Sequence, residues 1–177
     1  MKYFYVGATP EVDPAALAAV RDRVVAEFAA PVRELELPDL AFAFDPARRQ
    51  YGSIPVLEML TRLYPPDARK LLAITERDLF IPVLTFVFGH AQLGGGAAVV
   101  SLARLRQEFY GLEANREVFL ERADKEVLHE AGHTFGLVHC ADRNCAMALA
   151  TNVRQIDLKQ AAFCASCAAL LRRKLNA

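Results

Sequence analysis

Residues 115–140 read NREVFLERADKEVLHEAGHTFGLVHC, and this stretch decides how the rest of the chain is interpreted. From Asn115 to Phe135 it is rich in good helix formers and contains no proline, so it predicts one long helix. Gly136 follows at the position where a residue in the left-handed conformation ends a helix without a Cβ clash. We therefore expect a long helix that ends in a sharp turn.

Three histidines in this stretch have the spacing of a catalytic metal site. His129 and His133 lie four residues apart, so their side chains project from one helix face at directions that differ by roughly 40°. Glu130 is offset by roughly 100° from His129, which places it beside the metal, where it can accept a proton from the attacking water. The turn at Gly136 brings His139 within reach as a third ligand. Three protein ligands and one open position are typical of catalytic zinc.

A bare H-E-x-x-H also has a simpler interpretation. Two exposed histidines with an acidic residue between them would give the same pattern on any polar helix. The longer motif HEAGHTFGLVH, with Gly136 and His139 at the spacing that a third ligand needs, favours the metal site over this alternative.

The four cysteines form a second group, arranged as C-x4-C (Cys140, Cys145) and C-x2-C (Cys164, Cys167). Four thiolates have the number and softness for a closed tetrahedral zinc site. The alternatives are four reduced core cysteines, or a redox or metal-storage role for the CASC segment. Because His139 and Cys140 are adjacent, their side chains point to opposite sides of an extended backbone. We therefore expect two zinc ions per chain, one catalytic and one structural.

The combined pattern resembles the archaemetzincin family. It consists of HEAGHTFGLVH, Cys140, Cys145, Met147 and the Cys164-x-x-Cys167 pair, and the upstream stretches ITERDLF and FVFGHAQLGG are also similar to that family. The resemblance implies a metzincin-like fold and zinc metallopeptidase activity. It further implies a role for eight residues: His129, His133 and His139 as ligands of the catalytic zinc, Glu130 as the catalytic residue, and Cys140, Cys145, Cys164 and Cys167 as ligands of a second zinc.

Three further positions are open to two interpretations each. Met147 resembles the Met-turn, in which a thioether packs beneath the metal-binding imidazoles, but alone it could be an ordinary core methionine. Residues 148–155 lack the tyrosine that some metzincins use near the metal, and Asn152 is either a hydrogen-bond donor at the site or a turn residue. His90 either lines the cleft or is a solvated residue at its rim, and the second interpretation is favoured.

The rest of the sequence predicts a mixed α/β (α+β) fold. Alternating aromatic and β-branched residues favour strands, and apolar residues at helical spacing favour helices, the first with Asp13 as N-cap and Pro14 in the first helical position. The expected strands are 2–8, 32–37, 40–44, 70–75, 83–92 and 97–103, and the other expected helices are 14–30 and 54–63. The last two strands flank Gly94–Gly96 and should pair at one rim of the sheet.

The length predicts one compact domain over residues 1–177. Within it, residues 1–128 form the mixed, twisted sheet and the helices that lead into the active-site helix. Residues 129–177 form a zinc-binding, partly helical C-terminal portion.

Charge and composition exclude broad classes of partner. The 21 basic residues balance the 21 acidic ones, so no net field attracts nucleic acid or an acidic membrane. The apolar run at residues 81–88 is far shorter than the roughly 18 residues of a membrane span. The start, MKYFYVGATPEVDP, lacks the features of a signal peptide, which favours a cytoplasmic location. The expected partner is a peptide or protein substrate bound by a monomer.

These observations predict a zinc-dependent peptidase in which Glu130 is the general base and an extended substrate binds along the sheet edge near residues 87–92. The alternative is a non-enzymatic zinc-binding or interaction module with two structural metal sites. Glu130 discriminates between the two, because a purely structural three-histidine site needs no carboxylate beside the metal.

Overall fold

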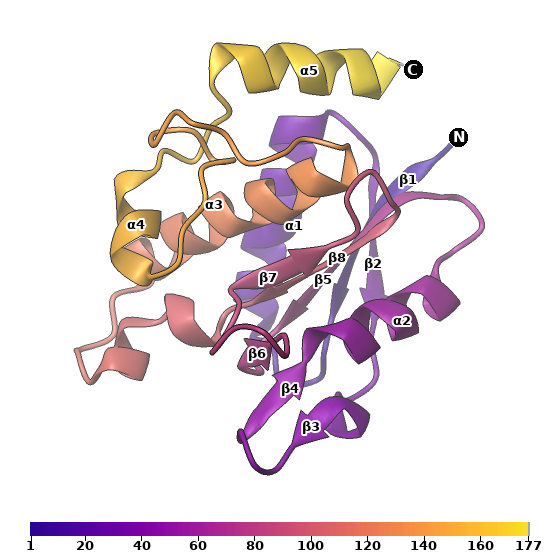
Figure 1. Cartoon of the computed structure of the whole chain (residues 1–177). Helices are drawn as coiled ribbons and strands as arrows, with labels where there is room; N and C mark the ends of the chain where they lie inside the picture. Colours follow the sequence, from indigo (N-terminus) through magenta and orange to yellow (C-terminus); the bar gives the residue numbers. More distant parts are fainter. Residues whose placement is uncertain (177) are drawn as a thin grey trace.

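The computed structural model describes residues 1–176 and contains a five-stranded mixed sheet with helices on both faces (Figure 1). The strand order is β2 (Val32–Glu36), β1 (Tyr3–Ala8), β5 (Ala68–Thr75), β8 (Ala97–Ser101) and β7 (Gly89–Ala91). The first four strands are parallel, and β7 pairs with β8 in the antiparallel direction. The predicted mixed α/β fold is confirmed, and so is the pairing of the two strands around Gly94–Gly96.

Two long helices cover one face of the sheet and a shorter helix covers the other. Helices α1 (Pro14–Phe28) and α3 (Arg116–Thr134) pack on the first face, and α2 (Ser53–Leu63) packs on the second. Asp13 caps α1 by accepting a hydrogen bond from the backbone of Ala15 at 3.1 Å, as predicted. Within residues 1–176, no helix has both the length and the apolar content needed to cross a membrane.

The period-2 alternation of the buried strands divides the core between the two faces. One set of strand residues faces α1 and α3, and it includes Phe4, Val6, Leu72, Ile74, Ala98 and Val100. The intervening set faces α2, and it includes Tyr5, Leu71, Ala73, Ala97 and Val99. Because β5 and β8 are buried on both faces, they read as nearly continuous apolar runs in the sequence.

The remaining elements are short and surround the sheet. A second, three-stranded sheet is built from β3 (Phe44–Asp45), β4 (Gln50–Gly52) and β6 (Leu79–Phe80). Three 3-10 turns lie at η1 (Ala41–Ala43), η2 (Ala103–Leu105) and η3 (Gln107–Tyr110), and the C-terminal portion holds α4 (Val153–Leu158) and α5 (Ala165–Asn176).

Two of the predicted strands are wrong in whole or in part. Most of the strand predicted at 40–44 is instead the 3-10 turn η1 (Ala41–Ala43), because the Asp39 carboxylate accepts a hydrogen bond from the backbone of Ala41 at 2.7 Å and favours a turn; only Phe44 lies in a strand, β3. The predicted strand 83–92 is reduced to Gly89–Ala91. In the segment before Gly89, the guanidinium group of Arg48 donates hydrogen bonds to the carbonyls of Pro82 and Leu84. These two carbonyls therefore have hydrogen-bond partners without belonging to a sheet.

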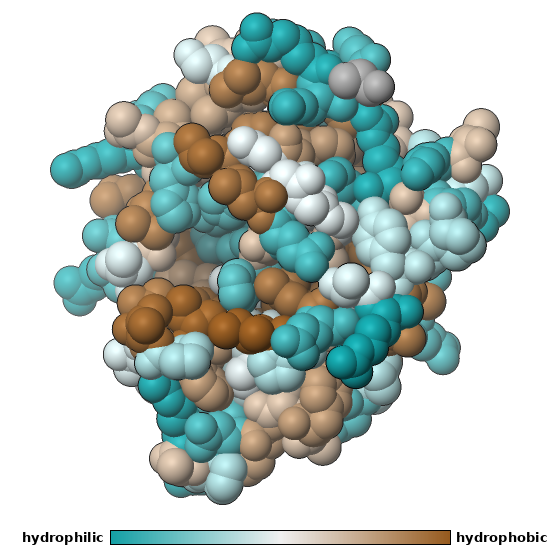
Figure 2. Space-filling view, turned by 45° about the vertical axis from the view of Figure 1, so that its right-hand side comes forward, coloured by the Kyte–Doolittle hydropathy of each residue, from teal (hydrophilic) through white to brown (hydrophobic). Residues whose placement is uncertain are grey.

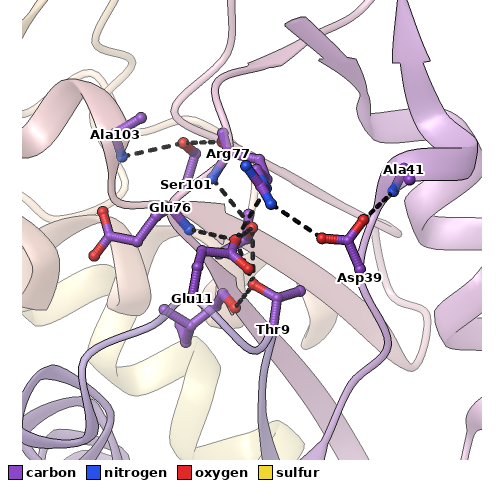
Figure 3. Close-up of polar contacts among 10 residues, drawn as sticks. Thr9, Glu11, Asp39, Ala41, Glu76, Arg77, Ser101 and Ala103 are labelled. Atoms are coloured by element: carbon purple, nitrogen blue, oxygen red, sulfur yellow. Dashed lines mark hydrogen bonds and ion pairs between the residues drawn. The ribbon is translucent and has the colours of Figure 1, made fainter.

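A polar network at the carboxyl ends of β1, β5 and β8 ties these strands together (Figure 3). One oxygen of Glu11 accepts hydrogen bonds from the hydroxyls of Thr9 at 2.8 Å and Thr75 at 2.9 Å. Arg77 lies 3.4 Å from the same oxygen, and Ser101 donates to the Arg77 carbonyl at 2.6 Å. Burial acts to raise the pKa of Glu11, but the hydrogen bonds from its own backbone and the two threonines, with the charge of Arg77, outweigh burial and lower it.

We predict that Glu11→Gln lowers the free energy of unfolding at neutral pH by about 1–3 kcal/mol, because the variant removes a charged acceptor shared by several buried donors. Since the folded-state pKa of Glu11 lies below its ordinary value, the carboxylate stabilises the fold at neutral pH. This contribution is lost as the pH falls through the folded-state pKa. Urea unfolding measured at several pH values should therefore show a difference from wild type that shrinks below about pH 4.

The matched control is Glu58→Gln, which changes an exposed glutamate on α2. It should leave the free energy of unfolding close to that of the wild type at every pH. An equal loss in both variants, or a loss in Glu11→Gln that does not depend on pH, would contradict the role assigned to this network.

Candidate active site

The long helix α3 ends in the sharp turn that the sequence predicts. Gly136 has φ 86°, its N–H donates to the carbonyl of His133 at 2.9 Å, and the N–H of Leu137 donates to that of Gly132 at 3.1 Å. These two bonds are those of a Schellman motif, which reverses the chain after a helix. The turn leads the chain back beside the last turn of α3, which brings His139 to the other two histidines.

The three predicted histidines form one cluster. One ring nitrogen of each lies within 4.8 Å of those of the others, and the Nε2 atoms of His129 and His133 are 3.1 Å apart. The Nδ1 atom of His129 lies 2.8 Å from the carbonyl oxygen of Ala146, and that of His133 lies 2.7 Å from that of Leu137. Because a carbonyl can only accept, Nδ1 carries the proton in both rings and the Nε2 lone pairs point into the cluster. The residues therefore fit a three-histidine zinc site.

Burial also favours the protonation state that a metal ligand needs. It lowers the pKa of His129 well below the ordinary histidine value and lowers those of His133 and His139 as well. The positive charge of Lys159 acts in the same direction on all three rings. The three imidazoles are therefore neutral at physiological pH and ready to bind a cation.

Glu130 lies beside the histidine cluster, and its side chain packs against Gly89 of the edge strand β7. Burial raises its pKa well above the ordinary glutamate value, and the nearby carboxylate of Glu126 raises it further, while Lys159 opposes this change. A buried carboxylate with a raised pKa is a better proton acceptor than a solvated one. This environment suits a general base.

A buried ion pair beneath the histidines was not predicted from the sequence. Lys159 Nζ lies 3.1 Å from Glu126 Oε1 and 3.3 Å from the carbonyl oxygen of Ala146, the same oxygen that His129 contacts. The side chain of Lys159 is 1% exposed and that of Glu126, which also lines the cleft, is 4% exposed, so both charges are almost fully buried. The partners are separated by 33 residues, and no local pattern signals the contact.

The four cysteines form a separate cluster at the start of α5. Their Sγ atoms all lie within 4.8 Å of one another, and those of Cys140 and Cys164 are 3.8 Å apart. A tetrahedral site with zinc–sulfur bonds of about 2.3 Å places its sulfurs about 3.8 Å apart. The Sγ atom of Cys145 also accepts hydrogen bonds from the backbone N–H groups of Met147 and Cys164. The donor set therefore fits a closed zinc site that is distinct from the histidine cluster.

Met147 packs under the part of α3 that carries the histidines, as the Met-turn interpretation predicted. Its side chain is fully buried, and a Cβ atom added to Gly132 would lie 2.5 Å from its sulfur. The carbonyl of Met147 accepts a hydrogen bond from the backbone of Cys140 at 3.0 Å. One short segment thus joins the cysteine cluster to the underside of the histidine site.

A cleft of about 580 Å³ opens over the histidines, between β7 and the segment that follows α3. The histidine rings and Glu130 line its base, and apolar side chains, among them Leu84, Val138 and Leu149, line its walls. Figure 2 shows apolar residues on both sides of a hollow in this face of the molecule.

Contacts also resolve the interpretation of His90 and Asn152, the other two positions that the sequence left open. His90 lines the cleft and is half-buried, with its Nδ1 atom 2.8 Å from the hydroxyl of Ser53, so the interpretation as a solvated rim residue is wrong. Burial lowers its pKa. Asn152 is the N-cap of α4 and accepts a hydrogen bond from the backbone of Gln155 at 3.1 Å, so it is a turn residue.

Comparison with known proteins gives a consistent result. Residues 60–173 match the model of Peptidase family M54. The archaemetzincin of Methanocaldococcus jannaschii is 40% identical over 134 residues, which are 76% of this chain and 72% of the relative. The crystal structure of the archaemetzincin of Methanopyrus kandleri matches with a TM-score of 0.87 and 32% identity, over 99% of this chain and 97% of that one. A zinc-dependent peptidase of Methanocorpusculum labreanum matches with a TM-score of 0.86 and 32% identity, over 95% of this chain and 99% of that one.

We predict that the purified protein holds two equivalents of zinc and that brief treatment with a chelator removes one of them first. The histidine cluster opens onto the cleft, whereas the four thiolates would enclose their metal. Zinc content by elemental analysis should fall from two to one per chain while the circular dichroism spectrum is unchanged.

The control for this assignment is Cys145→Ser, which should lose the slowly released zinc and retain the rapidly released one if the chain still folds. Simultaneous release of both equivalents from the wild type, or unfolding before the first is lost, would show that the open and closed sites have been assigned wrongly.

Proposed function

Because this chain belongs to peptidase family M54, the archaemetzincins, and is therefore a zinc metallopeptidase, we propose that Glu130 is its general base and that His129, His133 and His139 hold the catalytic zinc. The observation that carries this proposal is the cluster of three neutral imidazoles with a buried carboxylate beside it at the base of an open cleft. Membership of a peptidase family argues against the alternative of a non-enzymatic zinc-binding module.

The residues divide the chemistry of peptide hydrolysis between them. Zinc held at this site supplies a Lewis acid that polarises the scissile carbonyl and lowers the pKa of water. Glu130 accepts the proton of the attacking water and returns it to the amine that leaves, so the proton moves over a short distance inside the cleft. The carbonyls of Ala146 and Leu137 hold two imidazoles in the tautomer that leaves Nε2 free.

The edge strand β7 offers a peptide a defined set of backbone groups. The carbonyl of Phe88 accepts a hydrogen bond from the N–H of Ser101, and the N–H of Gln92 donates to the carbonyl of Ala97. Every second residue, counted from Phe88, therefore bonds to β8. In an antiparallel pair, the residues that alternate with these bonded ones direct their N–H and C=O groups away from the partner strand. These residues are Gly89 and Ala91. We expect the substrate to lie extended along them as an additional strand.

The walls of the cleft favour particular side chains. Val138 and Leu149 on one side and Leu84 on the other are exposed apolar residues that line the cleft. A peptide with large apolar side chains near the scissile bond would cover this surface and remove it from water. The substrate is therefore a peptide or protein with an accessible apolar stretch.

We propose a structural role for the second zinc. It would hold Cys140, Cys145, Cys164 and Cys167, and through them the segment that carries the Ala146 carbonyl and Met147 beneath the histidines. The cofactors are thus two zinc ions, one catalytic and one structural. The monomeric state, the cytoplasmic location and the absence of nucleic-acid and membrane partners stay predictions from the sequence.

We predict that Glu130→Ala retains both zinc equivalents and that its turnover of a peptide substrate falls by about 10²- to 10⁴-fold, because the variant removes the base and none of the ligands. His133→Ala should lose one zinc equivalent and its activity together. Zinc content and initial rates on a mixed peptide library measure both effects.

The matched control is Glu117→Ala, which truncates an exposed glutamate in the first turn of the same helix. It should behave as the wild type in both assays. Wild-type turnover in purified Glu130→Ala would exclude Glu130 as the base.

A further inference from the structure

We propose that Gly89 is a positioning residue for Glu130: the missing side chain of Gly89 makes the space in which the carboxylate of the base lies. This inference rests on the proposed function of Glu130 as general base. It concerns the substrate-binding strand itself, since Gly89 belongs to β7.

The contact is close and specific. A Cβ atom added to Gly89 would lie 2.5 Å from Cγ of Glu130, 2.6 Å from Oε1 and 2.7 Å from Cδ. Ordinary carbon and oxygen atoms in van der Waals contact lie about 3.5 Å apart or more, so no other residue type fits without movement. All three of the nearest atoms belong to the one side chain of Glu130.

The backbone of Gly89 does not require glycine. Its φ lies outside the left-handed region, unlike those of Gly94, Gly111 and Gly136. Gly89 also sits in a regular antiparallel pair, opposite Val100. Alanine or a β-branched residue is favoured over glycine in a strand, so the local structure alone would favour a residue with a side chain. Space for Glu130 is the remaining reason for glycine at this position.

The hairpin of β7 and β8 is bonded to the end of α3 at its turn, so β7 cannot readily move away from that helix. The N–H of Gly94 donates to the carbonyl of His133 at 2.8 Å. The ammonium group of Lys70 donates to the carbonyls of Gly95 at 2.7 Å and Thr134 at 2.6 Å, and so joins the hairpin turn to the end of α3. Strand pairing with β8 fixes β7 on its other side.

These constraints decide which group yields if a methyl group is added at Gly89. The strand and the helix are held by backbone hydrogen bonds, whereas the Glu130 carboxylate is the flexible end of a side chain. The carboxylate is therefore the group that moves. Alanine keeps the N–H and C=O of Gly89, so the backbone groups offered to a peptide are unchanged. The substitution should displace the base and leave the histidines, the fold and the binding of substrate intact.

The test is Gly89→Ala, measured for zinc content, melting temperature, kcat and KM beside Glu130→Ala. A displacement of about 1 Å in a catalytic group costs on the order of 10²-fold in rate, so kcat should fall by about that factor. KM and zinc content should stay close to the wild-type values. A merely structural defect would instead lower the melting temperature or the zinc content.

The matched control is Gly7→Ala in β1, where an added Cβ would lie 2.9 Å from the side chain of Leu37, remote from the site. It should keep the wild-type kcat even where crowding against Leu37 lowers its melting temperature. A wild-type kcat in Gly89→Ala, a loss that appears in KM, or a loss of zinc or of fold beyond the control would overturn the inference. Wild-type turnover in Glu130→Ala would instead overturn the proposed function, so the two failures are distinguishable.

Discussion

The backbone carbonyl of Ala146 connects the two metal-binding clusters of this protein. It accepts a hydrogen bond from His129 Nδ1, which sets the tautomer of the first ligand, and it also lies 3.3 Å from Lys159 Nζ. The same residue follows Cys145 directly, and its N–H donates to the carbonyl of Ala162 near the second cysteine pair. The position of this oxygen therefore depends on the loop that carries Cys145. Without that loop, the buried His129 ring would lose its acceptor and its preferred tautomer.

Burial of charge in this region is tolerated because most of the charges have partners. Removing a carboxylate and an ammonium group from water costs several kcal/mol each, and the Glu126–Lys159 contact at 3.1 Å offsets part of that cost. Among residues 1–176, Glu130 has no ion-pair partner, and its buried environment raises its pKa. A proton acceptor held in this way is unfavourable for stability and favourable for reaction, which is typical of functional sites. Of the buried pair nearby, Glu126 raises the pKa of Glu130 and Lys159 opposes this change.

Local patterns in the sequence were sufficient to predict α3, its end at Gly136 and the grouping of the histidines and cysteines. Those features depend on helix periodicity and on short spacings, which are visible in the chain itself. The Glu126–Lys159 pair could not be predicted, because only tertiary folding brings residues 33 positions apart together. Most of the strand predicted at 40–44 was wrong for a local reason, since Asp39 stabilises a turn at Ala41–Ala43. The strand at 83–92 was shortened by long-range contacts with Arg48.

Three glycines around the histidines solve three different geometric problems. Gly136 takes a left-handed φ that reverses the chain, whereas Gly132 and Gly89 leave room for the sulfur of Met147 and the carboxylate of Glu130. A side chain at Gly132 would occupy the space of the Met147 thioether. A side chain at Gly89 would occupy the space of the Glu130 carboxylate. The active-site helix can therefore be approached closely from below by the Met147 segment and from the side by the edge strand β7. That double approach brings the three histidines, the Glu130 carboxylate and the outer edge of β7 within reach of one another in a chain of this size.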